Sequence, residues 1–142
     1  LILRPHNIYG PRMGFSHVIP ELIKKIKFQK SKKIKIYSPS HKRAFCYIDD
    51  AIEQIVGLSF GTKAKNKTFN IGNSREEIKI FDLAKMIKNK LKSKKKLIKY
   101  IYTSGSPKRR VPSMSKTSSY LKKTKYINLN KGIQNYINWY KR

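Results

Sequence analysis

The residues Leu1-Ile2-Leu3-Arg4-Pro5-His6-Asn7-Ile8-Tyr9-Gly10-Pro11-Arg12 decide how the rest of the chain is interpreted. Three apolar residues predict the start of a buried strand, and the Gly-Pro pair predicts the turn that ends it. Polar side chains from Arg4 to Tyr9 lie in between. Because open α/β sheets bind ligands beyond the carboxyl ends of their strands, we expect a ligand here. An ordinary strand followed by a β-turn is the alternative.

Length and composition favour one domain. The chain has 142 residues, of which 39% are hydrophobic. It contains no apolar run of about 18 residues, so we expect no membrane span. The single Cys46 excludes an internal disulfide and fits a reducing compartment, so we expect a cytoplasmic protein. Between Phe45 and Tyr47, this cysteine is expected to be a small core residue and not a nucleophile.

The net charge of +27 raises the hypothesis of nucleic-acid binding, because a field of this size attracts polyanions. However, most of the charge comes from lysines that are spread over nearly every predicted element, which is typical of a solvated surface. An aromatic RNA-binding strand of the Lys-Gly-Phe-Gly-Phe type is also lacking. We therefore expect no nucleic-acid partner, and a basic nucleic-acid-binding module remains the alternative.

Hydrophobic periodicity predicts strands that alternate with helices, and hence an α/β fold. The expected strands after the first segment are 33–37, 68–73 and 97–102. The expected helices are 17–28, one starting at Ile48, 80–91, 115–121 and one starting near Asn128.

Three of these helices carry more specific predictions. For the helix at Ile48, Asp49 and Asp50 are expected to cap its start, and its core stripe is expected to be Ala51, Ile52, Ile55 and Val56. Ser115 and Asn128 are the expected caps of the last two helices. The core face of the final helix is expected to be Leu129, Ile133, Tyr136, Ile137 and Tyr140.

Catalytic constellations are largely absent from the sequence. Only 7 residues are acidic, and no convincing carboxylate pair stands out. His6, His17 and His41 lack the partners and spacing of a zinc site, so no metal is expected. The chain also has no Gly-x-Gly-x-x-Gly motif for a dinucleotide pyrophosphate. These residues predict a binding part and not a reaction centre.

Arginines, in contrast, are concentrated in three predicted loops: 7–12, 42–43 and 108–110, with Arg4 just before the first. Guanidinium groups bind phosphate in a bidentate geometry that lysine cannot reproduce. This distribution predicts a diphosphate pocket. Surface ion pairs are the alternative, although few acids are present to form them.

Four blocks in order make the chain similar to a known family. Arg4-Pro-His-Asn-Ile-Tyr-Gly-Pro-Arg12 resembles the segment after the catalytic Tyr-x-x-x-Lys of extended short-chain dehydrogenases, the NAD-dependent epimerases and dehydratases of nucleotide-sugars. Lys42 to Asp50 resembles their Thr-Arg-x-Phe-x-Tyr-Val-x-Asp block, and 69–73 their Asn-Ile-Gly turn. The loop 105–112 and the closing helix with Gly132, Trp139 and Tyr140 also resemble theirs.

The resemblance implies that residues 1–142 are the C-terminal, substrate-binding portion of such an enzyme, comprising late Rossmann strands and a smaller α/β subdomain. It implies NAD as cofactor, a nucleotide-sugar (a UDP-sugar above all) as substrate, and a homodimer as the usual state. Epimerisation, dehydration and decarboxylation all remain open. The NAD-binding half and the catalytic Tyr and Lys are expected to precede Leu1, so no catalytic residue is expected here. An inactive truncated fragment is a further alternative.

The same resemblance implies roles for individual residues. Pro5 and His6 would lie near the nicotinamide, and Asn7 would hydrogen-bond the diphosphate. His17 would contact the substrate, unless it is only a helix cap. Tyr37 would edge the nucleotide base, unless it is a core aromatic. A diphosphate clamp would consist of Arg43, unless it is a strand-end surface charge, together with either Arg109 or Arg110.

Three departures from the family pattern affect the expected pocket. Ser38-Pro39-Ser40-His41 replaces the usual Gly-x-Gly-Ser and should stiffen that loop. Ser113 stands where an acid usually follows the arginine loop, and Lys79 where a small hydroxyl residue usually caps the next helix. The nucleotide is therefore left open.

Overall fold

The computed structural model describes residues 1–121 and 125–140. Its strands are β1 (Ile2–Pro5), β2 (Ile8–Tyr9), β3 (Lys33–Ile36), β4 (Lys42–Ala44), β5 (Cys46–Tyr47), β6 (Thr68–Ile71), β7 (Glu77–Lys79), β8 (Lys96–Lys99) and β9 (Arg109–Arg110). Its helices are α1 (Val18–Phe28), α2 (Ile48–Ser59), α3 (Ile80–Lys90), α4 (Ser115–Tyr120) and α5 (Leu129–Tyr140), with a short 3-10 turn, η1 (Thr62–Ala64).

Short parallel strand pairs dominate the sheet structure. β1 pairs with β6, β2 with β5 and β3 with β8, all in parallel. The remaining sheet has the order β7-β4-β9, with β7 antiparallel and β9 parallel to β4. Parallel strands connected through helices are the defining feature of α/β proteins. The predicted α/β class is confirmed.

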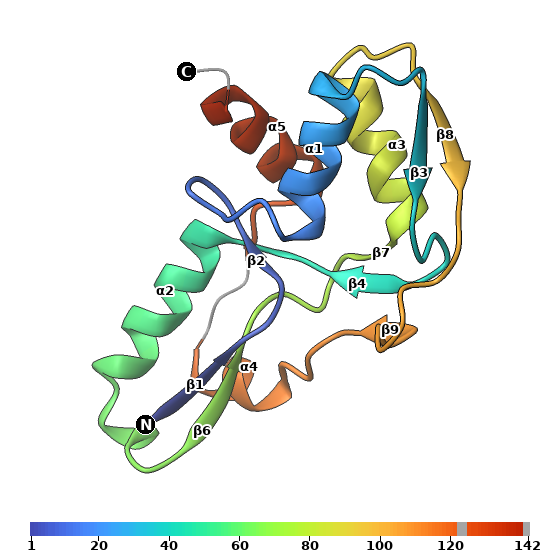
Figure 1. Ribbon diagram of the computed structural model, residues 1–142. Coiled ribbons are helices and arrows are strands. Elements are labelled where there is room, and N and C mark those ends of the chain that lie inside the picture. The colour runs from blue at the N-terminus through green and yellow to red at the C-terminus, as the bar shows by residue number, and fades with distance from the viewer. Residues whose placement is uncertain (122–124, 141–142) are drawn as a thin grey trace.

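Two hydrophobic clusters divide the molecule, and β2, β4 and β7 run between them (Figure 1). The larger cluster is enclosed by α1, α3, α5 and β3, and its fully buried members include Ile23, Ile34 and Leu83. The smaller one lies under α2 against β1 and β6, around Phe69. The three-stranded sheet therefore lies where the two packed regions meet.

Several sequence predictions are confirmed. The predicted helices 17–28 and 80–91 correspond to α1 and α3 within one residue at each end. Asn128 caps α5, because its Oδ1 accepts a hydrogen bond of 2.8 Å from the Lys131 backbone N–H. The Cys46 side chain is fully buried, as expected of a core residue.

Other predictions are wrong in detail. β1 is not buried, since it pairs only with β6 and leaves the Ile2 side chain 60% exposed. Met114, and not Ser115, occupies the N-cap position of α4. The strand predicted at 97–102 ends at Lys99, where β8 leaves its pairing with β3. The sequence also did not predict β7 or β9.

The predicted core face of α2 is partly inverted. Ile52 and Val56 are 49% and 48% exposed, whereas Asp50 and Gln54 are buried. Asp49 and Asp50 stand in the first turn, as predicted, and the N-cap residue is Tyr47, whose side chain makes no capping hydrogen bond. Asp50 Oδ2 accepts a hydrogen bond of 2.9 Å from the Ile127 backbone N–H. This carboxylate thus connects α2 to a segment far away in the sequence.

The longest helices, α2 and α5, have 12 residues each. A membrane crossing needs about 20 predominantly apolar residues. In the described part of the chain, no helix qualifies as a membrane span.

Candidate functional site: two arginines on one face of a three-stranded sheet

The register of the β7-β4-β9 sheet places Arg43 directly opposite Arg110, and Lys42 opposite Arg109. Side chains alternate between the faces of a strand, and paired residues share a face. Arg43 and Arg110 therefore lie on one face, and Lys42 and Arg109 on the other. The pairing brings together two of the three arginine loops that the sequence singled out.

Arg43 is half-buried and held by two hydrogen bonds. Its Nη1 donates to the Lys42 backbone carbonyl at 2.8 Å, and its Nη2 donates to Ser106 Oγ at 2.9 Å. Partial burial and the like charge of Arg110 lower the pKa of Arg43. This lowering means that its surroundings do not compensate its charge, so an anion bound beside it would be stabilised. Arg43 is thus no free strand-end charge.

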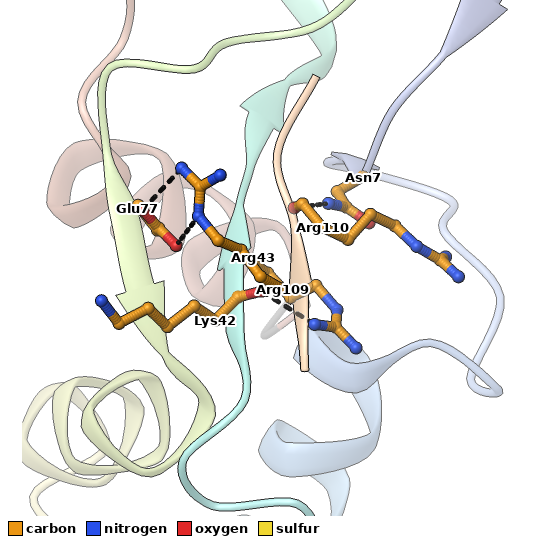
Figure 2. A network of polar contacts seen from close by, with 6 residues as sticks. All are labelled: Asn7, Lys42, Arg43, Glu77, Arg109 and Arg110. Atoms are coloured by element: carbon orange, nitrogen blue, oxygen red, sulfur yellow. Dashed lines mark hydrogen bonds and ion pairs between the residues drawn. The ribbon is translucent and has the colours of Figure 1, made fainter. Parts of the chain in front are cut away.

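Arg109 faces away from this pair. Its Nε lies 2.8 Å from Glu77 Oε1 and its Nη2 lies 3.2 Å from Oε2, which makes a bidentate ion pair with β7 (Figure 2). The hydrogen bond from Arg109 lowers the pKa of Glu77, and the carboxylate raises the pKa of Arg109. The sequence left open whether Arg109 or Arg110 joins Arg43, and the geometry brings Arg110 to it.

Asn7 connects the first arginine loop to the same place. Its Nδ2 donates to the Ala44 carbonyl at 2.9 Å. The same nitrogen donates to the Arg110 carbonyl at 3.4 Å (Figure 2). Its backbone has a φ of 46°, in the left-handed region that asparagine tolerates better than most residues. The turn after β1 therefore fastens the ends of β4 and β9 together.

Pro5 and His6 stand at the carboxyl end of the β1–β6 pair. Pro5 is opposite Ile71, and His6 Nε2 lies 3.2 Å from Asn70 Oδ1. A Cβ added at Gly72 would lie 3.5 Å from His6 Cβ and 3.2 Å from Pro112 Cγ, so the chain is closely packed here. This strand end has the position at which α/β folds bind ligands.

His17 and Tyr37 lie apart from the arginine pair. His17 is exposed at the N-cap position of α1, but its side chain makes no capping hydrogen bond. Tyr37 is 40% exposed, so it is not a core aromatic. Its ring contacts Tyr100 edge-on at 5.2 Å, and the Lys25 ammonium lies 5.2 Å from its centroid.

Arg4 and Arg12, the other loop arginines, are not brought to the pair either. Arg4 is exposed in β1, opposite Asn70. Arg12 lines a separate pocket with Phe15, Trp139 and Tyr140.

Sequence reasoning missed two partners of the arginines, Ser106 and Glu77. Glu77 carries a usable signal, because it is one of only 7 acids in a chain rich in cations. Ser106 has no such signal: its hydroxyl is a partner only because the loop before β9 packs beside β4.

Comparisons with known proteins agree with this architecture. A model of the NAD dependent epimerase/dehydratase family matches residues 1–72, just over half of the chain. UDP-glucuronic acid 4-epimerase from Bacillus cereus, solved with UDP-glucuronic acid and NAD, is 27% identical, with a TM-score of 0.86 over 99% of this chain and 45% of that one. No curated protein matches.

Two further solved structures, each 20% identical, share the fold. UDP-glucose 4-epimerase from Thermotoga maritima, solved with UDP-glucose, has a TM-score of 0.82 over 98% of this chain and 45% of that one. dTDP-glucose 4,6-dehydratase from Bacillus anthracis, solved with NAD, has a TM-score of 0.81 over 98% and 43%. The chain thus spans less than half the length of these structures. By its family match, the chain belongs to the NAD-dependent epimerase/dehydratase family.

Proposed function

We propose that this chain forms the substrate-binding part of an NAD-dependent nucleotide-sugar epimerase or dehydratase. In this proposal, Arg43 and Arg110 bind the diphosphate of a UDP-sugar. One observation carries it: two guanidinium groups from segments far apart in sequence share a sheet face as register partners. Among the described residues neither arginine is in an ion pair, whereas Arg109 is paired with Glu77. Two unpaired like charges favour an anionic ligand.

Asn7 has a supporting role in this proposal. Its amide nitrogen donates to the Ala44 and Arg110 carbonyls, so it connects the two strands that carry the arginines. Direct contact of Asn7 with a phosphate oxygen is part of the same proposal, and it requires Nδ2 to exchange its longer bond, to the Arg110 carbonyl at 3.4 Å, for the phosphate. Tyr37 is proposed to edge the nucleotide base, and His17 is proposed to contact the substrate.

The cofactor of the family is NAD, which when bound would supply the transient oxidation of a sugar hydroxyl. Pro5 and His6 fit its nicotinamide end, because they stand at the carboxyl end of a parallel strand pair with the His6 ring oriented by Asn70. The sequence has no Gly-rich dinucleotide motif, so these residues would contact only part of the cofactor. We therefore assign this chain to binding and orienting the sugar nucleotide, and not to hydride or proton transfer.

Calorimetric or NMR titration of the 142-residue chain with UDP-glucose, UDP and uridine tests the proposal. We expect UDP-glucose and UDP to bind, and uridine to bind much more weakly. Replacing Arg43 by Ala should weaken UDP binding by about 1.5–3 kcal/mol, because it removes a charged hydrogen-bond donor. Lys42→Ala is the matched control, since Lys42 is the adjacent cation on the other face. Equal losses for both variants would indicate nonspecific attraction and contradict the proposal.

The salt dependence of binding distinguishes the proposed function from the nucleic-acid alternative. Affinity for a polyanion falls steeply with rising salt and would depend on many lysines. A bidentate site for one diphosphate depends on two arginines and far less on salt. Oligonucleotide binding that exceeds UDP binding and survives Arg43→Ala would favour the alternative.

A further inference from the structure

The hydroxyl of Ser106 connects Arg43 to a buried histidine. Ser106 Oγ accepts the hydrogen bond from Arg43 Nη2 at 2.9 Å, and the same oxygen lies 3.2 Å from His41 Nδ1. A guanidinium can only donate, so the serine oxygen must act as acceptor toward Arg43. Its proton then remains available to a neutral His41 Nδ1, or its second lone pair to a protonated one. Ser106 can satisfy both neighbours at once.

His41 is itself held in place. Only 4% of its surface is exposed, and its ring is stacked on that of Tyr102, with centroids 5.2 Å apart and an interplanar angle of 25°. Tyr102 in turn has its hydroxyl 3.1 Å from Ser40 Oγ. A buried, stacked ring has few alternative positions. The nitrogen that faces Ser106 is therefore fixed by packing.

Backbone contacts also fix the loop that carries Ser106. The Thr103 N–H donates to Ser38 Oγ at 2.9 Å, and the Lys42 N–H donates to the Lys108 carbonyl at 2.8 Å. Between these two connections, Gly105 has a φ of +71°, a left-handed conformation that favours glycine. The turn 38–41, which departs from the family pattern, thus packs against the loop before β9.

Without Ser106, Arg43 would keep only its hydrogen bond to the Lys42 backbone carbonyl, at 2.8 Å, and its Nη2 would lose its fixed position. Arg110 is its register partner, and the repulsion between two like charges favours a conformation in which Arg43 extends into water. We infer that Ser106 and His41 are positioning residues, which hold the Arg43 guanidinium beside Arg110 before any anion binds. The inference rests on the proposed diphosphate site and adds to it how that site is preorganised. Preorganisation of one long side chain is worth about two- to tenfold in affinity.

Side-chain NMR of Arg43 in the ligand-free chain tests the anchor directly. The Arg43 guanidinium N–H signals should be slowly exchanging and dispersed in the natural sequence and in Ser106→Thr, which keeps the hydroxyl. In Ser106→Ala the Nη2 signals should be averaged by exchange and rotation, whereas the Nη1 group keeps its bond to the Lys42 carbonyl. His41→Phe, which keeps a ring against Tyr102 but removes Nδ1, should give an intermediate result. Ser104→Ala, an exposed serine of the same loop, should have no effect.

UDP titration of the same variants provides the second readout. We expect Ser106→Ala to weaken UDP binding about two- to tenfold, Ser106→Thr to restore it, and the loss to vanish when Arg43 is already Ala. One outcome is that UDP binds neither the natural sequence nor any variant, while the Arg43 signals still depend on the hydroxyl at position 106. That result would contradict the proposed function but support the positioning role of Ser106. If the Arg43 signals are unchanged in Ser106→Ala, or if the loss persists in the Arg43→Ala background, the inference is wrong.

Discussion

The phenol oxygen of Tyr9 occupies the space in which a side chain at Gly132 would begin. A Cβ added at Gly132 would lie 2.0 Å from Tyr9 Oη and 3.0 Å from Tyr47 Cδ2. Tyr9 is only 1% exposed and contacts Phe45 and Tyr47 edge-on. β2 and α5 therefore pack together through a glycine.

Gly132→Ala should destabilise the fold by about 1–3 kcal/mol, as overpacking of a core does. Helix propensity alone would favour alanine by up to about 1 kcal/mol. A net decrease in the free energy of unfolding would therefore be due to the steric clash. Urea denaturation followed by circular dichroism measures it. Gly14→Ala is the control, because its Cβ would meet nothing closer than His17 Cδ2 at 4.0 Å. Equal stability of the two variants would contradict this packing.

Gln54 holds the end of β6 in the smaller core. Its Oε1 accepts from the Gly72 N–H at 3.0 Å, and its Nε2 donates to the Gly72 carbonyl, also at 3.0 Å. Because Gln54→Ala would leave these buried backbone groups unsatisfied, we expect a loss of about 2–4 kcal/mol. Val56→Ser, on the exposed face of the same helix, should change stability by less than about 0.5 kcal/mol. Chemical denaturation measures both losses. A larger loss for Val56→Ser than for Gln54→Ala would support the core face that the sequence predicted for α2.

Asp50 connects α2 to the segment before α5. Removing its carboxylate in Asp50→Ala leaves the Ile127 N–H without this acceptor, so the free energy of unfolding should fall by about 1–3 kcal/mol. Asp49→Ala removes an exposed acid from the same helical turn and should have a much smaller effect. Thermal melts of both variants compare the two positions. Similar losses would mean that the first-turn position, and not the contact with Ile127, is responsible.

The Glu77–Arg109 pair predicts an acid-sensitive contribution to stability. The hydrogen bond from Arg109 lowers the pKa of Glu77 below its ordinary value of 4.5. A carboxyl whose pKa is lowered on folding stabilises fully above its unfolded pKa, and this contribution disappears as the pH falls through the folded pKa. Below about pH 4.5 the natural sequence protonates Glu77 and loses the ion pair with Arg109. The stability of Glu77→Gln should therefore depend less on pH in this range than that of the natural sequence.

Urea midpoints measured from about pH 7 to about pH 3 compare the two curves. Arg109→Gln should flatten the same limb, because it removes the other partner. An unchanged acid limb in both variants would show that the pair contributes nothing to folding.

Sequence reasoning located most elements but not their contacts. The 3.6-residue periodicity predicted the existence of α1, α3 and α5 and the buried face of α5, because each of these helices buries a continuous apolar stripe. The same reasoning gave the wrong face for α2, where Asp50 and Gln54 are buried because they satisfy backbone groups. Hydrophobicity cannot signal a polar residue that is needed inside.

The functional hypothesis divides in the same way. Composition and order alone indicated that scarce arginines in three loops mark an anion site, and that these loops resemble those of one family. Which arginine joins Arg43 depended on the register of β4 and β9, since adjacent residues of a strand point to opposite faces. That register is set by long-range pairing, to which the turn at Asn7 and the Glu77 ion pair contribute. Local sequence determined the helices, strands and charges, and only the tertiary structure decided which charges face each other.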